Sequence, residues 1–186
     1  MTTVDRHSSL IVVVPAEVPA MRRRFVTLAV AASELPCLVV GGGTIGTRKA
    51  VTLVAQGADV RVVSPTISPR LAAMAHAGHL RWIAEPYRSD HLDGARLVVA
   101  ATSDRDLNGR IASEARARGL LVCQSSRAKD SQVIFPALCS EGLATVAVHT
   151  GGAVPRFAKR LRDHLIELLR RHPLETEQTS YRQSRP

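Results

Sequence analysis

Short apolar runs alternate with segments of helical spacing from about residue 37 to residue 124. The apolar runs are residues 37–40, 60–63, 80–84, 97–101 and 120–123. Between most of them, apolar residues recur at helical spacing over residues 47–56, 68–78 and 106–118, and each segment stops at a glycine. A further strand is expected over residues 25–31, with Leu28 and Val30 on one face. This alternation predicts an α/β fold with a parallel sheet and right-handed crossovers.

Beyond residue 124 the pattern changes. Residues 133–138 and 143–149 have the composition of two strands, and the short connection between them, residues 139–142, predicts a hairpin. Pro155 suits the first turn of a final helix that runs to about residue 171. The expected inner stripe of that helix is Phe157, Leu161, Leu165 and Leu168 or Leu169.

These patterns divide the chain into four parts. Residues 25–127 are expected to form the nucleotide-binding α/β domain, and residues 128–172 the hairpin and a basic helix. The polar composition of residues 173–186 and the proline-interrupted residues 1–24 predict disordered ends. The apolar run before Pro15 is too short for a secretory signal, and Met21, followed by three arginines, suggests an alternative start of translation.

A glycine-rich loop follows the first strong apolar run. Gly41, Gly43 and Gly46 fit the spacing G-x-G-x-x-G between an expected strand and an expected helix. The first glycine permits a tight turn, the second lets a diphosphate approach the backbone, and the third lets the helix pack closely on the sheet. Free N–H groups at the helix start would face the anion. The loop therefore predicts a Rossmann-like dinucleotide site; the alternative is a glycine-rich turn without a ligand.

The end of the second strand is where a dinucleotide-binding fold usually carries an acidic residue for the ribose. Ser64, Pro65 and Thr66 hold that place, while Asp59 lies at the other end of the strand. The residues alone therefore leave the choice between NAD and NADP open. Thr102 follows another expected strand, on the ligand-binding edge, where it either contacts the cofactor or caps the next helix. Arg48 and Lys49 either add charge near the phosphates or lie on a solvated helix face.

A second glycine loop precedes the basic helix. Thr150, Gly151 and Gly152 lie at its start, and Arg156 follows, which predicts a second anion-binding site. His149 is a candidate catalytic residue, although a single histidine on a strand is more often structural. No spacing of His, Cys, Asp and Glu suggests a resident metal, and no nucleophile elbow is present in the sequence.

Composition narrows the class of partner. The 186-residue chain is 45% hydrophobic and 22% charged, which is typical of a globular protein, and no apolar stretch is long enough to span a bilayer. Its formal charge of +9 favours anionic partners, but aromatic residues make up only 3%, which argues against binding of single-stranded nucleic acid. Three cysteines without a C-x-x-C pair are typical of a reduced, cytoplasmic protein.

At this point the ordered set of motifs resembles a known family, the precorrin-2 dehydrogenase and sirohydrochlorin ferrochelatase module of sirohaem synthase. The similarity extends over about residues 25–170. The motifs that carry it are residues 36–43, Arg48-Lys49-Ala50, Gly57-Ala58, residues 100–104, Asn108, residues 134–136 and residues 146–155.

The resemblance implies oxidation of precorrin-2 to sirohydrochlorin with NAD as cofactor, and in some members iron insertion at the same site. It also implies a homodimer in which the hairpin takes part. Thr44 and Ile45 would contact the cofactor phosphates, Pro65 and Thr66 would lie by its ribose, and Thr150 stands where the family has a serine. The polycarboxylate tetrapyrrole would account for the basic helix, because clustered cations attract a polyanion.

One segment departs from the family pattern. The family carries an aspartate, the expected general base, just after the strand that in this chain ends at Cys123. Arg127 falls nearest to that position, and the loop is about one residue shorter. A cation cannot accept a proton as a carboxylate does. Asp130 and His149 are the remaining candidates, besides water, and iron insertion stays open.

Two other functions compete with this interpretation. The altered loop is compatible with a non-catalytic carrier or sensor that binds a tetrapyrrole or a dinucleotide. Nucleic-acid binding by the basic helix is disfavoured, because its apolar stripe is typical of a packed helix and no groove-reading motif is present.

Overall fold

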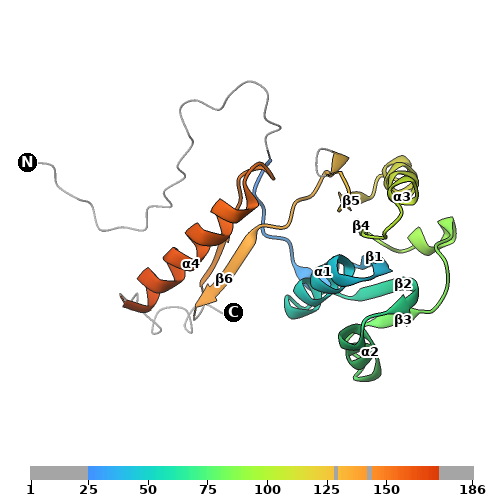
Figure 1. Ribbon diagram of the computed structural model, residues 1–186, viewed down its shortest axis with the longest axis horizontal. Helices are drawn as coiled ribbons and strands as arrows, with labels where there is room; N and C mark the ends of the chain where they lie inside the picture. The colour runs from blue at the N-terminus through green and yellow to red at the C-terminus, as the bar shows by residue number, and fades with distance from the viewer. Residues whose placement is uncertain (1–24, 128–129, 142–143, 172–186) are drawn as a thin grey trace, which may run out of the picture.

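The computed structural model describes residues 25–127, 130–141 and 144–171. The expectations for the disordered ends, residues 1–24 and 173–186, lie outside the described residues. Figure 1 shows two parts of the molecule: an α/β body built on a parallel sheet, and a hairpin covered by a long helix. Two connections join them, one before the first strand of the sheet and one after its last strand.

The α/β body is a five-stranded parallel sheet with the order β3-β2-β1-β4-β5. Its strands are β1 Cys37–Gly42, β2 Val60–Ile67, β3 Arg81–Ile83, β4 Leu97–Ala100 and β5 Leu121–Gln124. Its helices are α1 Thr44–Ala55, α2 Pro69–His76 and α3 Arg105–Ala117, with 3-10 turns at Ala32–Glu34 and Ser89–Leu92. The predicted α/β, Rossmann-like fold is confirmed.

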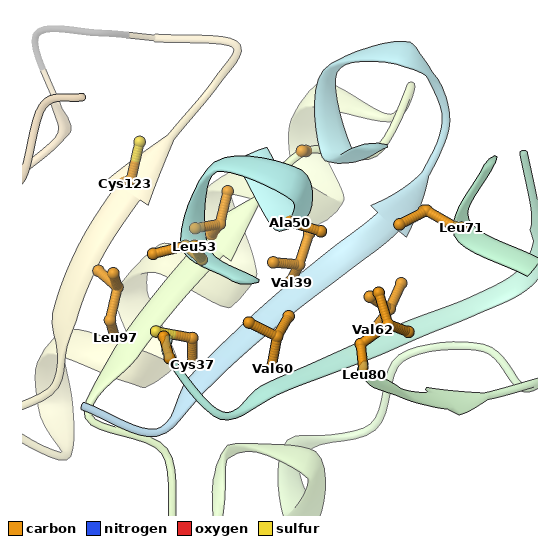
Figure 2. Close-up of a cluster of buried hydrophobic side chains, with 13 residues drawn as sticks. Cys37, Val39, Ala50, Leu53, Val60, Val62, Leu71, Leu80, Leu97 and Cys123 are labelled. Atoms are coloured by element: carbon orange, nitrogen blue, oxygen red, sulfur yellow. The ribbon is translucent and has the colours of Figure 1, made fainter. Parts of the chain in front are cut away.

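Helices cover both faces of the sheet, so the central strands are apolar on both sides. On one face, alternate residues of β1 and β2 pack against α1 and α2, and Figure 2 shows this cluster around Val39, Ala50 and Leu71. On the other face, Leu38 and Val40 of β1 pack with Ile111 of α3. Because β1 lies between β2 and β4, the chain reverses its direction of winding at β1, and its carboxyl end is the ligand-binding crevice of such folds.

The second part contains β6 Ala137–Glu141, β7 Ala144–Val148 and α4 Pro155–Arg171. The two strands pair antiparallel, with Cys139 opposite Val146, and α4 packs against them. The predicted hairpin and the extent of the last helix are therefore confirmed. The first strand, however, begins at Ala137 and not at residue 133, because the N–H groups of Gln132 and Val133 bond to the Val122 carbonyl and Pro136 has no N–H for a ladder.

One expectation about an apolar segment is wrong, and a second holds only in part. Residues 25–31 form no strand and pair with neither sheet; Leu28 and Val30 are 75% and 57% exposed. In α4 the expected inner stripe is only partly buried: Leu165 and Leu169 are half-buried, whereas Phe157, Leu161 and Leu168 are 56%, 36% and 41% exposed. Ala158, next to Phe157, is the buried residue of this helix. The described residues thus leave two apolar surfaces open to solvent.

Candidate functional site

The glycine loop joins the carboxyl ends of the three central strands. Gly41 has φ +113°, and a Cβ there would lie 2.4 Å from the Ala101 carbonyl oxygen, at the end of β4. A Cβ on Gly42 would lie 2.3 Å from the carbonyl oxygen of Thr66, in β2, and one on Gly46 would lie 1.9 Å from the Gly41 oxygen. Three positions of the loop therefore have no room for a side chain, for reasons internal to the fold.

Gly43 differs from its neighbours, because a Cβ there would meet nothing within 4 Å. It caps α1, and the first helical hydrogen bond runs from the Thr47 N–H to the Gly43 carbonyl. Within the described part of the chain, no side chain caps the helix start at Gly43. The amides of Thr44, Ile45 and Gly46 are therefore available to an anion, and the open space at Gly43 fits the approach of a diphosphate. The two residues after Gly43 are exposed.

The expected ribose end is built from hydroxyl and backbone groups. The Ser64 hydroxyl accepts the Gly42 N–H at 3.1 Å, and the Trp82 indole N–H donates to the Ser64 carbonyl at 2.9 Å. Pro65 and Thr66 are exposed beside them. The Ser64 hydroxyl accepts one bond from the loop and keeps its own O–H as a donor, so Ser64, Pro65 and Thr66 all stay predicted ribose contacts.

Thr102 is held in place by a buried side chain that the sequence did not single out for this role. The Asn108 amide oxygen accepts the Thr102 N–H at 3.0 Å, and the Asn108 amide donates to the Thr102 carbonyl at 3.0 Å. Asn108 is fully buried, while Asp104 provides the helix cap by accepting the N–H groups of Asp106 and Leu107. Asn108 therefore fixes the end of β4 that faces the glycine loop.

The second glycine loop forms a tight start for α4. The Thr150 hydroxyl accepts the Val154 N–H at 2.9 Å, and Gly151 and Gly152 have positive φ values. Arg156 follows in the first turn, is exposed and lines a cavity together with Thr150 and Gly152. The predicted substrate residues are thus neighbours in space, although their binding role stays a prediction.

His149 has both ring nitrogens engaged. Its Nδ1 accepts the Gly151 N–H at 3.2 Å, so in the neutral ring Nε2 carries the proton and donates to the Thr27 hydroxyl at 2.9 Å. The Phe25 ring packs edge-on against it at 6.4 Å. To accept a substrate proton, His149 would first have to give up its bond to Gly151.

Asp130, the other candidate base, follows β5 in a turn closed by its N–H to the Arg127 carbonyl at 2.9 Å. It is not among the residues that line the cavity. The adjacent Ser131 fixes this turn, because its buried hydroxyl accepts the Gln124 N–H at 2.8 Å. The structure therefore does not bring Asp130 and His149 into one cluster.

A cavity of about 570 Å³ opens between α1, the segment that leads into β6, and the start of α4. Of the residues that the structure describes, five permanent cations line it, two on α1 and three on α4, and no carboxylate does. Its remaining walls are apolar or hydroxyl-bearing, with Phe135, Pro136, Leu138 and Val148 among them. The cations are Arg48, Lys49, Arg156, Lys159 and Arg162.

Lys49 is the least solvated of the cations on α1. Its Nζ lies 3.7 Å from the centroid of the Phe135 ring, a cation–π contact. Burial lowers the pKa of Lys49, nearby Arg48 lowers it further, and Cys123 acts in the opposite direction. The sequence left open whether Arg48 and Lys49 lie near the phosphates or on a solvated helix face. Both line the cavity, a position that depends on the packing of α4 and residues 134–138 and that no local pattern reveals.

The described residues contain neither a metal-binding group nor a helix that could span a membrane. Among residues 25–127, 130–141 and 144–171, no three His, Cys, Asp or Glu side chains form a group that could hold a metal ion. None of the helices in these ranges is long and apolar enough to cross a bilayer.

Comparisons with known proteins agree with this geometry. A family model described as "Putative NAD(P)-binding" matches residues 28–137. A "Siroheme synthase" of Chromobacterium violaceum is 43% identical over 133 residues, which cover 72% of this chain and 28% of that protein. "Siroheme synthase 1" of Aeromonas salmonicida is 39% identical over 137 residues, 74% of this chain and 29% of that protein. The chain therefore spans less than a third of the length of these relatives.

Among solved structures, "SirC, precorrin-2 dehydrogenase" matches with a TM-score of 0.66 and 29% identity over 77% of this chain and 71% of that chain. The resemblance to the precorrin-2 dehydrogenase module of sirohaem synthase is thus confirmed, as is the expected nicotinamide dinucleotide cofactor, NAD. Since the family model covers more than half of the sequence, the chain belongs to the NAD(P)-binding family that this model describes.

Proposed function

We propose that the protein oxidises precorrin-2 to sirohydrochlorin, with NAD as hydride acceptor. The proposal rests on two features of α1. The amides at the start of the helix have no side-chain cap, and the cations on its side line an adjoining cavity that contains no described carboxylate. Such a pair of sites suits a diphosphate cofactor beside a polycarboxylate substrate.

In this proposal the glycine loop holds the cofactor. The amides of Thr44 and Ile45 bind the diphosphate, Gly43 leaves it room, and Pro65 and Thr66 border the ribose. Bound NAD supplies the chemistry of hydride acceptance. Asn108 keeps Thr102 and the end of β4 fixed at the crevice where the nicotinamide would lie.

The cavity holds the tetrapyrrole. Its apolar wall around Phe135 and Pro136 fits the macrocycle, and Thr150, Gly152 and Arg156 bind carboxylates at its rim. Opposite charge steers a polyanion into such a site and raises the association rate. The proton that leaves the substrate goes to water, to Asp130 after a rearrangement of its turn, or to His149 after release of Gly151.

The test is direct. Purified protein, incubated anaerobically with precorrin-2 and NAD, should develop the absorption spectrum of sirohydrochlorin and reduce NAD in equal amount. Heat-denatured protein is the control. Failure to convert precorrin-2 with either NAD or NADP would overturn the proposal.

Iron insertion is not expected. Arg127 falls nearest to the place of the family's aspartate, and a guanidinium there would repel ferrous iron and could not take the protons that the metal displaces. Addition of ferrous iron to sirohydrochlorin and protein should therefore leave the rate of sirohaem formation at its uncatalysed value. An Arg127→Asp variant that forms sirohaem faster than the parent would support this reason.

A second candidate is a non-catalytic carrier or sensor of tetrapyrroles or dinucleotides. It is favoured by the engaged ring of His149 and by the position of Asp130 outside the cavity walls. Tight binding of both ligands without any turnover would select it over the enzyme.

The proposal includes a cytoplasmic homodimer. Support for the dimer comes from the apolar residues that the described chain leaves exposed, namely Leu28 and Val30 before the sheet and Phe157, Leu161 and Leu168 on α4. The Thr27–His149 contact ties the first of these segments to the hairpin part, so both apolar surfaces belong to the same end of the molecule.

A further inference from the structure

Helix α1 meets two different environments along its length. Its first residues, Thr44 to Gly46, present amides at the carboxyl edge of the sheet, whereas Arg48, Lys49 and Thr52 line the cavity. None of residues 41–46 lines that cavity, which is instead walled by α4 and by residues 134–138. The cavity therefore offers these cations a partner other than a diphosphate at the helix head.

Cations of α1 and of α4 line the same cavity, and none of the described lining residues is a carboxylate. Among the described residues, ion pairs neutralise Arg162, through its neighbour Asp163, but none is formed by Arg48, Lys49 or Lys159. Like charges that line one cavity repel each other. A ligand with several carboxylates would relieve this repulsion from both sides.

Lys49 lines this cavity and is also in contact with its apolar wall. It is half-buried, it is the cation of α1 that contacts the apolar wall, and the Phe135 ring fixes its ammonium group in the cavity. Contact with the ring favours the charged form, while burial has removed part of its hydration. An ammonium group that has already lost water gains more from a carboxylate than a solvated one does, because less hydration remains to be lost.

We propose that Lys49, assisted by Arg48, anchors substrate carboxylates, so that α1 binds both reactants: the cofactor at its amide head and the tetrapyrrole on its side. The inference rests on the proposed function for the identity of the substrate. In this inference Lys49 positions the macrocycle relative to the cofactor, because both ligands bind to the same helix.

The experiment compares charge-removing variants inside and outside the cavity. Lys49→Gln and Arg48→Gln each remove one cavity cation, Lys49→Arg keeps the charge, and Arg116→Gln on the exposed surface of α3 is the control with the same change in net charge. Circular dichroism and thermal unfolding verify the fold of each variant. Steady-state kinetics give kcat and KM for precorrin-2, and calorimetry gives the Kd of NAD.

For Lys49→Gln we expect the KM for precorrin-2 to rise about tenfold or more, from the loss of one charge-assisted bond, with the Kd of NAD unchanged within about twofold. Arg48→Gln should shift KM in the same direction, Lys49→Arg should restore most of the affinity, and Arg116→Gln should have no effect. A rise in the Kd of NAD in Lys49→Gln with an unchanged KM for precorrin-2 would overturn the inference, as would an equal effect of Arg116→Gln.

A binding measurement separates this inference from the proposed enzyme activity. Uroporphyrin, a polycarboxylate porphyrin that is not oxidised in this assay, is titrated with protein and followed by fluorescence anisotropy. If the parent protein binds uroporphyrin and Lys49→Gln weakens this binding about tenfold, Lys49 anchors carboxylates even if precorrin-2 is not oxidised. If the parent does not bind it, or if Lys49→Gln binds as the parent does, the anchor is refuted whatever the enzyme assay gives.

Discussion

At the scale of single residues, two glycines of the glycine loop lack a side chain for different reasons. Gly46 is required by the fold, because a Cβ would overlap the Gly41 carbonyl oxygen at 1.9 Å. Gly43 is required by none of the described residues, since nothing lies within 4 Å of the place that its Cβ would take. Gly43 lies at the head of α1, beside amides that no described side chain caps, so its open space fits a diphosphate and supports the proposed cofactor site.

A matched pair of variants tests this distinction. Gly46→Ala should lower the free energy of unfolding by about 1–3 kcal/mol, as expected for overpacking against backbone. Gly43→Ala should cost less than about 1 kcal/mol and yet weaken NAD binding at least tenfold, because the methyl group would occupy the diphosphate's path. Urea unfolding and calorimetry with NAD measure the two effects. Equal NAD affinity in Gly43→Ala and the parent would contradict the proposed path.

Cys37 gives a prediction of pH dependence. Burial, and to a smaller extent Asp59, raises the pKa of Cys37 to about 11, and its S–H donates to the Leu35 carbonyl at 3.0 Å. An acid whose pKa is raised by folding stabilises the native state below its unfolded pKa, and this contribution disappears as the pH rises. Between about pH 9 and the folded-state pKa of about 11, the urea midpoint should fall in the parent and fall less in Cys37→Ala. Parallel curves for the two proteins would refute the assignment.

At the scale of elements, α3 and β4 are joined through one buried amide. Asn108 bonds to the N–H and to the carbonyl of Thr102, at 3.0 Å each, where the strand meets the ligand-binding edge. A side chain that satisfies two backbone groups at once fixes the relative position of strand and helix more firmly than apolar packing alone. The cofactor edge therefore depends on a residue that lies beneath it.

Adjacent substitutions in α3 test the role of Asn108. Asn108→Ala leaves the Thr102 backbone groups without their partner and should cost about 1–3 kcal/mol of unfolding free energy while weakening NAD binding. Gly109→Ala, one residue on, meets nothing within 4 Å and should instead stabilise the helix by up to about 1 kcal/mol with NAD affinity unchanged. Thermal unfolding and calorimetry report both. A normal NAD Kd in Asn108→Ala would show that the edge does not depend on this amide.

At the scale of the whole molecule, the α/β body and the hairpin part have different surfaces. The body buries a core on both faces of the sheet, and its exposed large apolar residues, Ile45, Trp82 and Leu121, lie on three different elements. The hairpin part leaves Phe157, Leu161 and Leu168 exposed on α4, whereas Ala158 of the same helix is buried. Exposed apolar residues grouped on one helix mark an interaction surface, and the proposed partner is a second copy of the chain.

The dimer is tested on α4. Leu161→Glu places a charge within the apolar surface and should convert a dimer of the full chain into a monomer, as measured by sedimentation equilibrium. Arg160→Gln, at the neighbouring exposed position, changes the net charge by the same single unit, is the control for charge alone and should remain dimeric. A monomeric parent protein, or a dimer that Leu161→Glu leaves intact, would remove the proposed interface.

Features that depend on local patterns could be predicted from the residues alone. The order of strands and helices, the glycine loop with α1 behind it, the hairpin and the length of α4 all follow from apolar periodicity, glycine and proline, which act within a few residues. The start of β6 could not be predicted in this way. The N–H groups of Gln132 and Val133 bond to the Val122 carbonyl in β5, a contact across the turn that the Ser131 hydroxyl holds.

Only the tertiary structure shows which apolar residues are packed against others and which cations line the same cavity. Residues 25–31 have the composition of a strand, but they pair with neither sheet, and periodicity does not show whether a segment finds a neighbouring strand. The face of α4 that packs is set by the hairpin beneath it. Lys49 lies over Phe135, a residue far along the chain, since packing brings α1 and the segment before β6 together. The chemistry of the site is encoded in local motifs, whereas its assembly depends on contacts between distant segments.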